Sequence, residues 1–338
     1  MGKTSIEWCD HSINPLRARL KDGTSVGHYC EKISQGCANC YSSKFQPRFG
    51  MPAFGSGQRL QDVELFLDEA KLDEVRRRKK PTRYFWCDMT DMFGDWVKPE
   101  WIGEILRTID ATPQHTHQLL TKRPENIQRM WSGGFRNNCW LGTSVENQEC
   151  ADKRIPELLK CRHLSPVLFL SCEPLLGEVD LCYPRSLYPN GPQNCCSGFE
   201  CGCQGMPIDP PEYLWSPDGD SIDWVIVGGE SGPSSRPLNP HHARSLINQC
   251  KTFGVPVFFK QVGEWASFTM DYPGLHIVAH QEDGSDVLIG ADVDGKRYGK
   301  DHVYLNDLDE IAYVKVGKKA AGRLFEGVEY SQFPKVGE

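Results

Sequence analysis

Short apolar runs recur along the chain as far as Gln261, and segments with helical periodicity lie between several of them. The runs are continuous rather than alternating, which is typical of parallel strands that are buried on both faces. We expect strands at Ile6–Cys9, Tyr84–Cys87, His117–Thr121, Trp140–Val145, Val167–Cys172, Trp224–Gly228 and Val257–Gln261. Helices are expected at Pro99–Ala111, Pro124–Trp131, Ala151–Lys160 and Pro240–Phe253.

The first of these helices has the clearest amphipathic pattern, because Ile102, Ile105 and Ile109 fall on one of its faces. Several of the expected helices begin at or near a proline, which suits the first turn of a helix. Strands and helices in alternation indicate an α/β fold. We expect a parallel, partial TIM-type βα barrel of about six to seven strands.

Three regions interrupt the alternation of strands and helices. The first, Arg48–Arg83, contains a helix-like stretch at Val63–Arg78. The second, 182–222, is rich in Pro, Gly and Cys and reads as an insertion between two strands. The third, 267–338, has the pattern of a small β-rich appendage with one helical turn near Lys318–Leu324. We therefore expect a barrel at 1–266, which contains the insertion, and a C-terminal appendage at 267–338.

Composition and charge narrow the class of protein. No apolar run is long enough to span a bilayer, so we expect no membrane partner. The start of the chain lacks the apolar segment of a secretory signal, so we expect a cytoplasmic protein, bacterial or in the host cytoplasm if viral. A net charge of −7 does not indicate a general nucleic-acid binder. It does not exclude a groove in which basic residues are concentrated. The chain has 15 cysteines, which in a reducing compartment indicate metal ligands or redox groups rather than disulfides.

Cys30, Cys37 and Cys40 form the densest early cluster, in a loop after the first expected strand. Three thiolates can surround one metal centre, and soft thiolates favour zinc or an iron–sulfur cluster. Zinc would need a further ligand, such as His11 or His28. A 4Fe–4S cluster would leave one iron open to an external ligand. The loop lies at the carboxyl edge of the expected sheet, where ligands bind in α/β folds.

Polar clusters follow most of the expected strands, and the carboxyl ends of parallel strands meet at one edge of the sheet. Carboxylates suit ribose hydroxyls or an ammonium group, and Lys or Arg suits a carboxylate or phosphate. The candidates for catalysis are Glu146, Glu173 and Lys122; those for cofactor binding are Asp88, Thr90, Asp91, Ser144, Gly228, Gly229 and Glu230; and those for substrate binding are Arg123, Lys260 and Gln261.

Several motifs in this chain are shared with a known family. They are Thr4–Trp8, Gly36–Tyr41, Leu120–Pro124, Ser144–Gln148, Ser171–Gly177, Asp223–Gly232, Phe258–Gln261 and Gly317–Leu324. With these motifs, nearly the whole chain resembles the phage and bacterial three-cysteine-motif proteins. That family carries a domain of unknown function and is grouped with the radical S-adenosylmethionine (radical SAM) barrels.

The resemblance implies a radical SAM enzyme in which Cys30, Cys37 and Cys40 hold a 4Fe–4S cluster whose open iron binds S-adenosylmethionine. Cys30 and Cys37 lie further apart than in the common radical SAM motif. The resemblance also implies a reductant protein, a family partner protein and, from the occurrence of the family in phages, a DNA-modification role. The substrate would be a hypermodified nucleobase or nucleotide in phage DNA, which the enzyme modifies or rearranges.

A second group of cysteines, in the insertion, leaves two interpretations open. Cys195, Cys196, Cys201 and Cys203 could bind zinc or a second cluster, or belong to a reduced loop without metal. An alternative function for the whole chain is a non-catalytic zinc- or cluster-binding protein that binds nucleic acid or a partner. In that case the three early cysteines form a structural clip.

Overall fold

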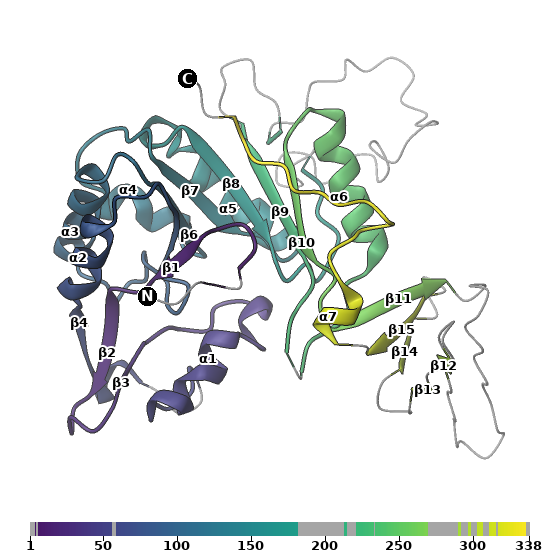
Figure 1. Cartoon of the computed structure of the whole chain (residues 1–338), viewed down its shortest axis with the longest axis horizontal. Helices are drawn as coiled ribbons and strands as arrows, with labels where there is room; N and C mark the ends of the chain where they lie inside the picture. The colour runs from purple at the N-terminus through teal and green to yellow at the C-terminus, as the bar shows by residue number, and fades with distance from the viewer. Residues whose placement is uncertain are drawn as a thin grey trace.

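The computed structural model describes residues 4, 6–55, 59–181, 213–214, 221–232, 234–269, 290–291, 297–298, 303–306, 311–315 and 317–335. Its main feature is a parallel sheet of seven strands that curls into a half-barrel (Figure 1). In spatial order the strands are β1 (His11–Ile13), β5 (Arg83–Trp86), β6 (Thr116–Thr121), β7 (Cys139–Ser144), β8 (Val167–Cys172), β9 (Trp224–Gly228) and β10 (Val257–Gln261). The expected mixed α/β fold with a parallel sheet is confirmed, and the sheet has the expected number of strands.

The two faces of the sheet are buried in different ways. Helices pack on the convex face, where the predicted stripe of Ile102, Ile105 and Ile109 is fully buried. An aromatic cluster that includes Phe169 and Trp224 fills the concave face. Burial on both faces explains why the strands read as continuous apolar runs. The helices are α1 (Tyr41–Phe45), α2 (Glu69–Arg77), α3 (Pro99–Asp110), α4 (Ile127–Met130), α5 (Gln148–Leu159), α6 (Pro240–Thr252) and α7 (Lys318–Ala321), with 3₁₀ turns at Gln35–Cys37, Gln46–Phe49, Leu60–Asp62, Pro124–Asn126 and Arg162–Leu164.

The strand expected at Ile6–Cys9 is wrong, because the structure has a turn there. Trp8 from this turn is buried inside the half-barrel, with its ring centroid 4.5 Å from that of Phe85 and 6.2 Å from that of Trp224. The apolar residues of this segment therefore plug the concave face of the sheet. A short apolar run shows that a segment is buried but does not show that it pairs with a strand.

The helix expected at Val63–Arg78 is also wrong in its first part. The segment begins with β4 (Val63–Leu67), and α2 follows it. Strand β4 pairs antiparallel with β2 (Leu16–Leu20), and β2 pairs with β3 (Val26–Gly27), which gives a separate three-stranded sheet. Asp68 has an extended backbone and separates β4 from α2. Pairing with a distant segment decided the conformation here, and helical periodicity could not reveal it.

The described part of 267–338 contains antiparallel strands. They are β11 (Trp265–Thr269), β12 (Gly290–Ala291), β13 (Arg297–Tyr298), β14 (Val303–Asn306) and β15 (Ile311–Lys315). The tail then runs back along the edge of β10, where the Phe259 N–H donates to the Tyr330 carbonyl at 2.9 Å and the Gln332 N–H to the Val257 carbonyl at 3.1 Å. The tail thereby covers one edge strand of the half-barrel. Among the described residues, no helix has the length and apolar character needed to cross a bilayer.

Candidate functional site

A pocket of about 500 Å³ opens at the carboxyl edge of the half-barrel. The apolar side chains of Ile6, Trp8, Phe85 and Leu120 line one part of it. Most of the predicted site residues line the rest: Cys30, Cys37, Cys40, Asp88, Thr90, Asp91, Lys122, Arg123, Ser144, Glu173, Glu230 and Lys260. The strand ends and the cysteine-bearing loop therefore supply one common site.

Glu146, Gly228, Gly229 and Gln261 are not among the lining residues. A Cβ atom on Gly229 would lie 1.9 Å from the carbonyl oxygen of Val262, so this glycine allows two chain segments to pack closely. The side-chain amide of Gln261 donates to the Ser231 hydroxyl. In the structure, these two positions connect the ends of β9 and β10.

Cys30, Cys37 and Cys40 are free thiols that border the same pocket. Burial raises the pKa of Cys30, and the neighbouring Asp91, Cys40 and Cys37 raise it further when they are charged. Burial also raises the pKa of Cys40, while the backbone N–H groups of Ser43 and Ser42 act in the opposite direction. What the three thiols share in the structure is the pocket that they line.

The donor set fits a metal–sulfur centre in its chemistry. Soft thiolates that receive backbone N–H groups are typical ligands of zinc and iron–sulfur clusters, and a bound cation would offset the repulsion between the thiolates. Within the described ranges, no set of three or more His, Cys, Asp and Glu side chains has the arrangement of a metal site. Neither His11 nor His28 lines the pocket. Cys195, Cys196, Cys201 and Cys203 lie outside the described residues.

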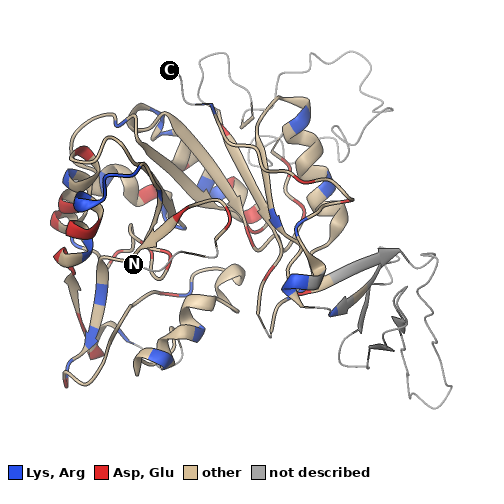
Figure 2. Ribbon diagram, in the orientation of Figure 1, with Lys and Arg blue, Asp and Glu red and all other residues tan. Residues whose placement is uncertain are grey.

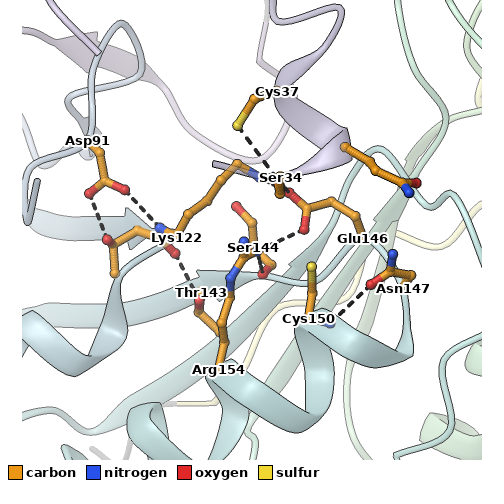
Figure 3. Close-up of polar contacts among 12 residues, drawn as sticks. Ser34, Cys37, Asp91, Lys122, Thr143, Ser144, Glu146, Asn147, Cys150 and Arg154 are labelled. Carbon is orange, nitrogen blue, oxygen red and sulfur yellow. Dashed lines mark hydrogen bonds and ion pairs between the residues drawn. The ribbon is translucent and has the colours of Figure 1, made fainter. Parts of the chain in front are cut away.

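Glu146 is buried behind the pocket between two cations. Its carboxylate contacts the Lys122 ammonium and accepts a hydrogen bond from Arg154 Nη1 at 2.8 Å (Figure 3). The Ser34 hydroxyl donates to the same carboxylate at 2.7 Å. Burial alone would raise the pKa of Glu146, but Lys122 and Arg154 outweigh burial and lower the pKa to about 2. Glu146 is therefore charged at neutral pH.

Glu230 is held in a similar way at the end of β9. The Arg236 guanidinium donates to both of its oxygens, at 2.7 and 3.0 Å, and the Asn39 amide donates at 3.0 Å. Burial raises the pKa of Glu230, but the hydrogen bonds from Arg236 and Asn39 more than compensate, and the pKa is lowered.

The predicted residues Asp91 and Thr90 make hydrogen bonds within the fold. Asp91 accepts from the Thr121 hydroxyl at 2.6 Å, the Lys122 N–H at 2.9 Å and the Phe93 N–H at 3.0 Å. The hydroxyl of Thr90 donates to the Tyr29 carbonyl. The contacts of Asp91 tie the loop after β5 to the end of β6, and the contact of Thr90 ties the same loop to the segment before the cysteine-bearing loop.

Asp88, Glu173 and Lys260 present polar groups at the pocket. Burial raises the pKa of Asp88, although hydrogen bonds from Asn14 and Tyr41 partly oppose the rise. Glu173 and Lys260 form an ion pair at 2.6 Å in which both side chains are largely buried. The pair offers an ammonium donor and a carboxylate acceptor side by side.

Basic residues also gather beside the pocket despite the negative net charge. Helices α1 and α7 both contribute to its lining, and their charged residues are all lysines: Lys44, Lys318 and Lys319 (Figure 2). Both acidic and basic residues lie on the outer helices α2 and α3 (Figure 2). The pocket therefore has lysines on α1 and α7 in addition to the acidic and basic residues that line it.

Residues 3–334 match a family model described as a protein of unknown function (DUF5131). The match covers almost the entire chain. The protein belongs to the DUF5131 family. No curated protein and no solved structure matches the chain. The description of the DUF5131 family names no activity, so a radical SAM assignment has to be argued from the site itself.

Sequence reasoning missed several residues that shape this DUF5131 site, among them Ser34 and Arg236. Ser34 lies 112 positions from its partner Glu146, and Asn39 lies 191 positions from its partner Glu230. A single sequence carries no signal for such pairs. The motif around Asn39 and the alternation of strands place both partners at the same edge, but they do not show that the partners meet.

Proposed function

We propose that this protein is a radical SAM iron–sulfur enzyme that modifies or rearranges a nucleobase or nucleotide, with hypermodified phage DNA as its substrate. The observation that carries the proposal is the convergence of Cys30, Cys37 and Cys40 on one pocket at the carboxyl edge of a parallel half-barrel. When bound there, a 4Fe–4S cluster would supply the electron that cleaves S-adenosylmethionine to a 5′-deoxyadenosyl radical, and a reductant protein would supply that electron in turn.

The chain's own residues have separate tasks in this proposal. The three cysteines hold the cluster. Trp8 and Phe85 give the pocket an apolar wall that suits a flat ring and excludes water. The ammonium of Lys260 and the guanidinium of Arg123 are donors for a carboxylate or phosphate. Asp88 and Glu173 are acceptors for hydroxyl or ammonium groups.

The nucleotide part of the proposal has its own support in the pocket. An aromatic wall, paired donors and acceptors, and lysines at the rim match a ligand with a ring, a polar edge and a negative charge. A DNA substrate and a family partner protein both belong to this part of the proposal. A non-catalytic protein in which the same thiols bind zinc is the competing assignment, and the metal that the protein holds separates the two.

Anaerobic reconstitution with iron and sulfide tests the enzyme assignment. We expect the parent protein to bind iron, to absorb at about 400 nm as iron–sulfur proteins do, and to release 5′-deoxyadenosine from S-adenosylmethionine after reduction. Cys37→Ala should lose the absorbance and the cleavage, because one cluster ligand is gone, while the strands still fold. Cys161→Ala is the matched control, since Cys161 is buried in the core away from the pocket.

Two results would rule out the radical SAM assignment. The first is a parent protein that holds zinc. The second is a parent protein that is fully loaded with iron yet releases no 5′-deoxyadenosine with DNA or nucleotides present. Cys37→Ala with unchanged iron content would show that Cys37 is not a ligand.

A further inference from the structure

The cysteine loop, residues 34–40, is attached to the half-barrel at two points, and each point is a buried carboxylate. At the first point the Ser34 hydroxyl donates to Glu146 at 2.7 Å (Figure 3). A Cβ atom on Gly36 would lie 2.5 Å from the same carboxylate, so the loop backbone rests directly on Glu146. Glu146 follows β7, which places this attachment at the end of a central strand.

The second attachment lies at the end of β9. The amide of Asn39 donates to Glu230 at 3.0 Å and to the Ser234 carbonyl at 2.7 Å. Arg236, which pairs with Glu230, also donates to the Gln35 carbonyl at 3.0 Å. The loop is thus held near both of its ends, on either side of Cys37.

Both carboxylates are fixed acceptors. Glu146 is completely buried and contacts Lys122 and Arg154. The side chain of Glu230 is 6% exposed, and both of its oxygens accept hydrogen bonds from Arg236. Oxygens held by cations in this way cannot turn toward a small ligand without leaving a buried charge unpaired. Each carboxylate also accepts a hydrogen bond from the cysteine loop, Glu146 from Ser34 and Glu230 from Asn39.

One of the attachments continues to a thiol. The Ser34 oxygen lies 3.6 Å from the sulfur of Cys37. Since the Ser34 proton is donated to Glu146, the hydroxyl oxygen can only accept from this thiol. Glu146, Ser34 and Cys37 therefore form a chain of contacts from the end of β7 to the proposed cluster ligand.

We propose that Glu146 and Glu230 are positioning residues that hold the cysteine loop, and with it Cys37 and Cys40, at the edge of the pocket before any metal is bound. The inference builds on the proposed function, because it assumes that the three thiols share one centre. A loop with only a 3₁₀ turn and the short α1 has little structure of its own to orient two sulfurs. Attachment to two strand ends removes that freedom in advance, which strengthens ligand binding without adding contacts to the ligand.

The test uses variants on the loop side, which leave the buried ion pairs intact. Ser34→Ala removes the contact with Glu146, and Asn39→Ala removes the contact with Glu230. Lys32→Ala is the matched control, because it removes an exposed hydrogen bond to the Ala38 carbonyl of the loop that does not involve the half-barrel. Ser34→Thr keeps a hydroxyl and serves as the rescue variant.

The first measurement is the rate at which iodoacetamide alkylates each thiol in the metal-free protein, followed by mass spectrometry. We expect Cys37 and Cys40 to react about tenfold faster or more in the Ser34→Ala/Asn39→Ala double variant, because a loosened loop exposes them more often. Lys32→Ala and Ser34→Thr should match the parent. Thermal unfolding checks that the double variant is folded.

The second measurement follows reconstituted protein by visible and electron paramagnetic resonance spectra and by the rate of iron loss to a chelator. Ser34→Ala should change the spectra, because a polar oxygen 3.6 Å from the Cys37 sulfur and the attachment of the loop to Glu146 have both been removed. The double variant should lose iron about tenfold faster or more. Unchanged alkylation rates, spectra and iron loss in folded variants would overturn the inference.

The two proposals fail separately. A parent protein that holds iron but cleaves no S-adenosylmethionine contradicts the enzyme assignment and leaves the positioning role supported by the alkylation and iron-loss data. A parent protein that cleaves S-adenosylmethionine, with variants that behave like it in every measurement, contradicts only the positioning role.

Discussion

At the scale of single residues, the charge of Glu146 depends on two cations that are buried with it. Removing one member of a buried ion pair costs about 3–5 kcal/mol, because the remaining charge has no partner. We expect Glu146→Gln to lower the free energy of unfolding by about this amount at neutral pH, since Lys122 and Arg154 would then share a neutral amide. Urea unfolding of the parent and the variant measures the difference. The matched control is Asp62→Asn, which alters an exposed ion pair with Arg59 and should change little.

The pH dependence of the same difference follows from the lowered pKa of Glu146. A carboxyl whose pKa falls from 4.5 to about 2 on folding stabilises the protein fully above pH 4.5, and it loses this contribution as the pH falls toward 2. The difference between the parent and Glu146→Gln should therefore be constant above pH 5 or so and shrink below it. A difference that persists unchanged at pH 3 would show that Glu146 is not charged in the folded protein.

At the scale of elements, the turn at Ile6–Cys9 fills the concave face of the half-barrel without pairing with any strand. Trp8 packs against Phe85, Phe169 and Trp224 inside the half-barrel. Deleting a buried aromatic side chain costs about 3–5 kcal/mol, so Trp8→Ala should lower the free energy of unfolding by that amount and enlarge the pocket. Trp8→Phe should recover part of the loss, and Phe135→Ala, at an exposed position, should have little effect. A folded Trp8→Ala protein within about 1 kcal/mol of the parent would show that the turn is not part of the core.

The accuracy of sequence-based prediction also differs between elements. Strands β8, β9 and β10 begin and end at the residues expected from their apolar runs, because burial on both faces leaves an uninterrupted pattern. The pattern of β4 predicts a helix instead of a strand, because the conformation of β4 depends on pairing with β2.

The candidate site was predictable as far as strand ends define it, since Asp88, Glu173 and Lys260 all reach the pocket. The contacts of Ser34 and Asn39 depend on how distant segments meet, which one sequence does not encode in any local pattern.

At the scale of the whole molecule, both ends of the described chain complete the half-barrel. The N-terminal turn fills its concave face, and residues 328–333 cover the edge of β10. Phe333 packs on Trp224 and Phe258, with ring centroids 5.1 and 5.4 Å apart, and Trp224 Nε1 donates to the Gln332 carbonyl at 2.9 Å. An open sheet with an uncovered hydrophobic edge strand is a template for pairing with other chains.

Shortening the chain to end at Gly327 tests this view of the molecule. The shortened protein would expose the edge of β10 and the ring of Trp224, so we expect it to unfold at a lower temperature and to associate in a concentration-dependent way. Light scattering and sedimentation measure the association, and Trp fluorescence reports the exposure of the aromatic cluster. A chain that ends at Lys335 keeps every tail contact described here and is the control. If the shortened protein stays monomeric and as stable as the control, the tail is not part of the half-barrel, and the edge of β10 has to be protected by β10 itself.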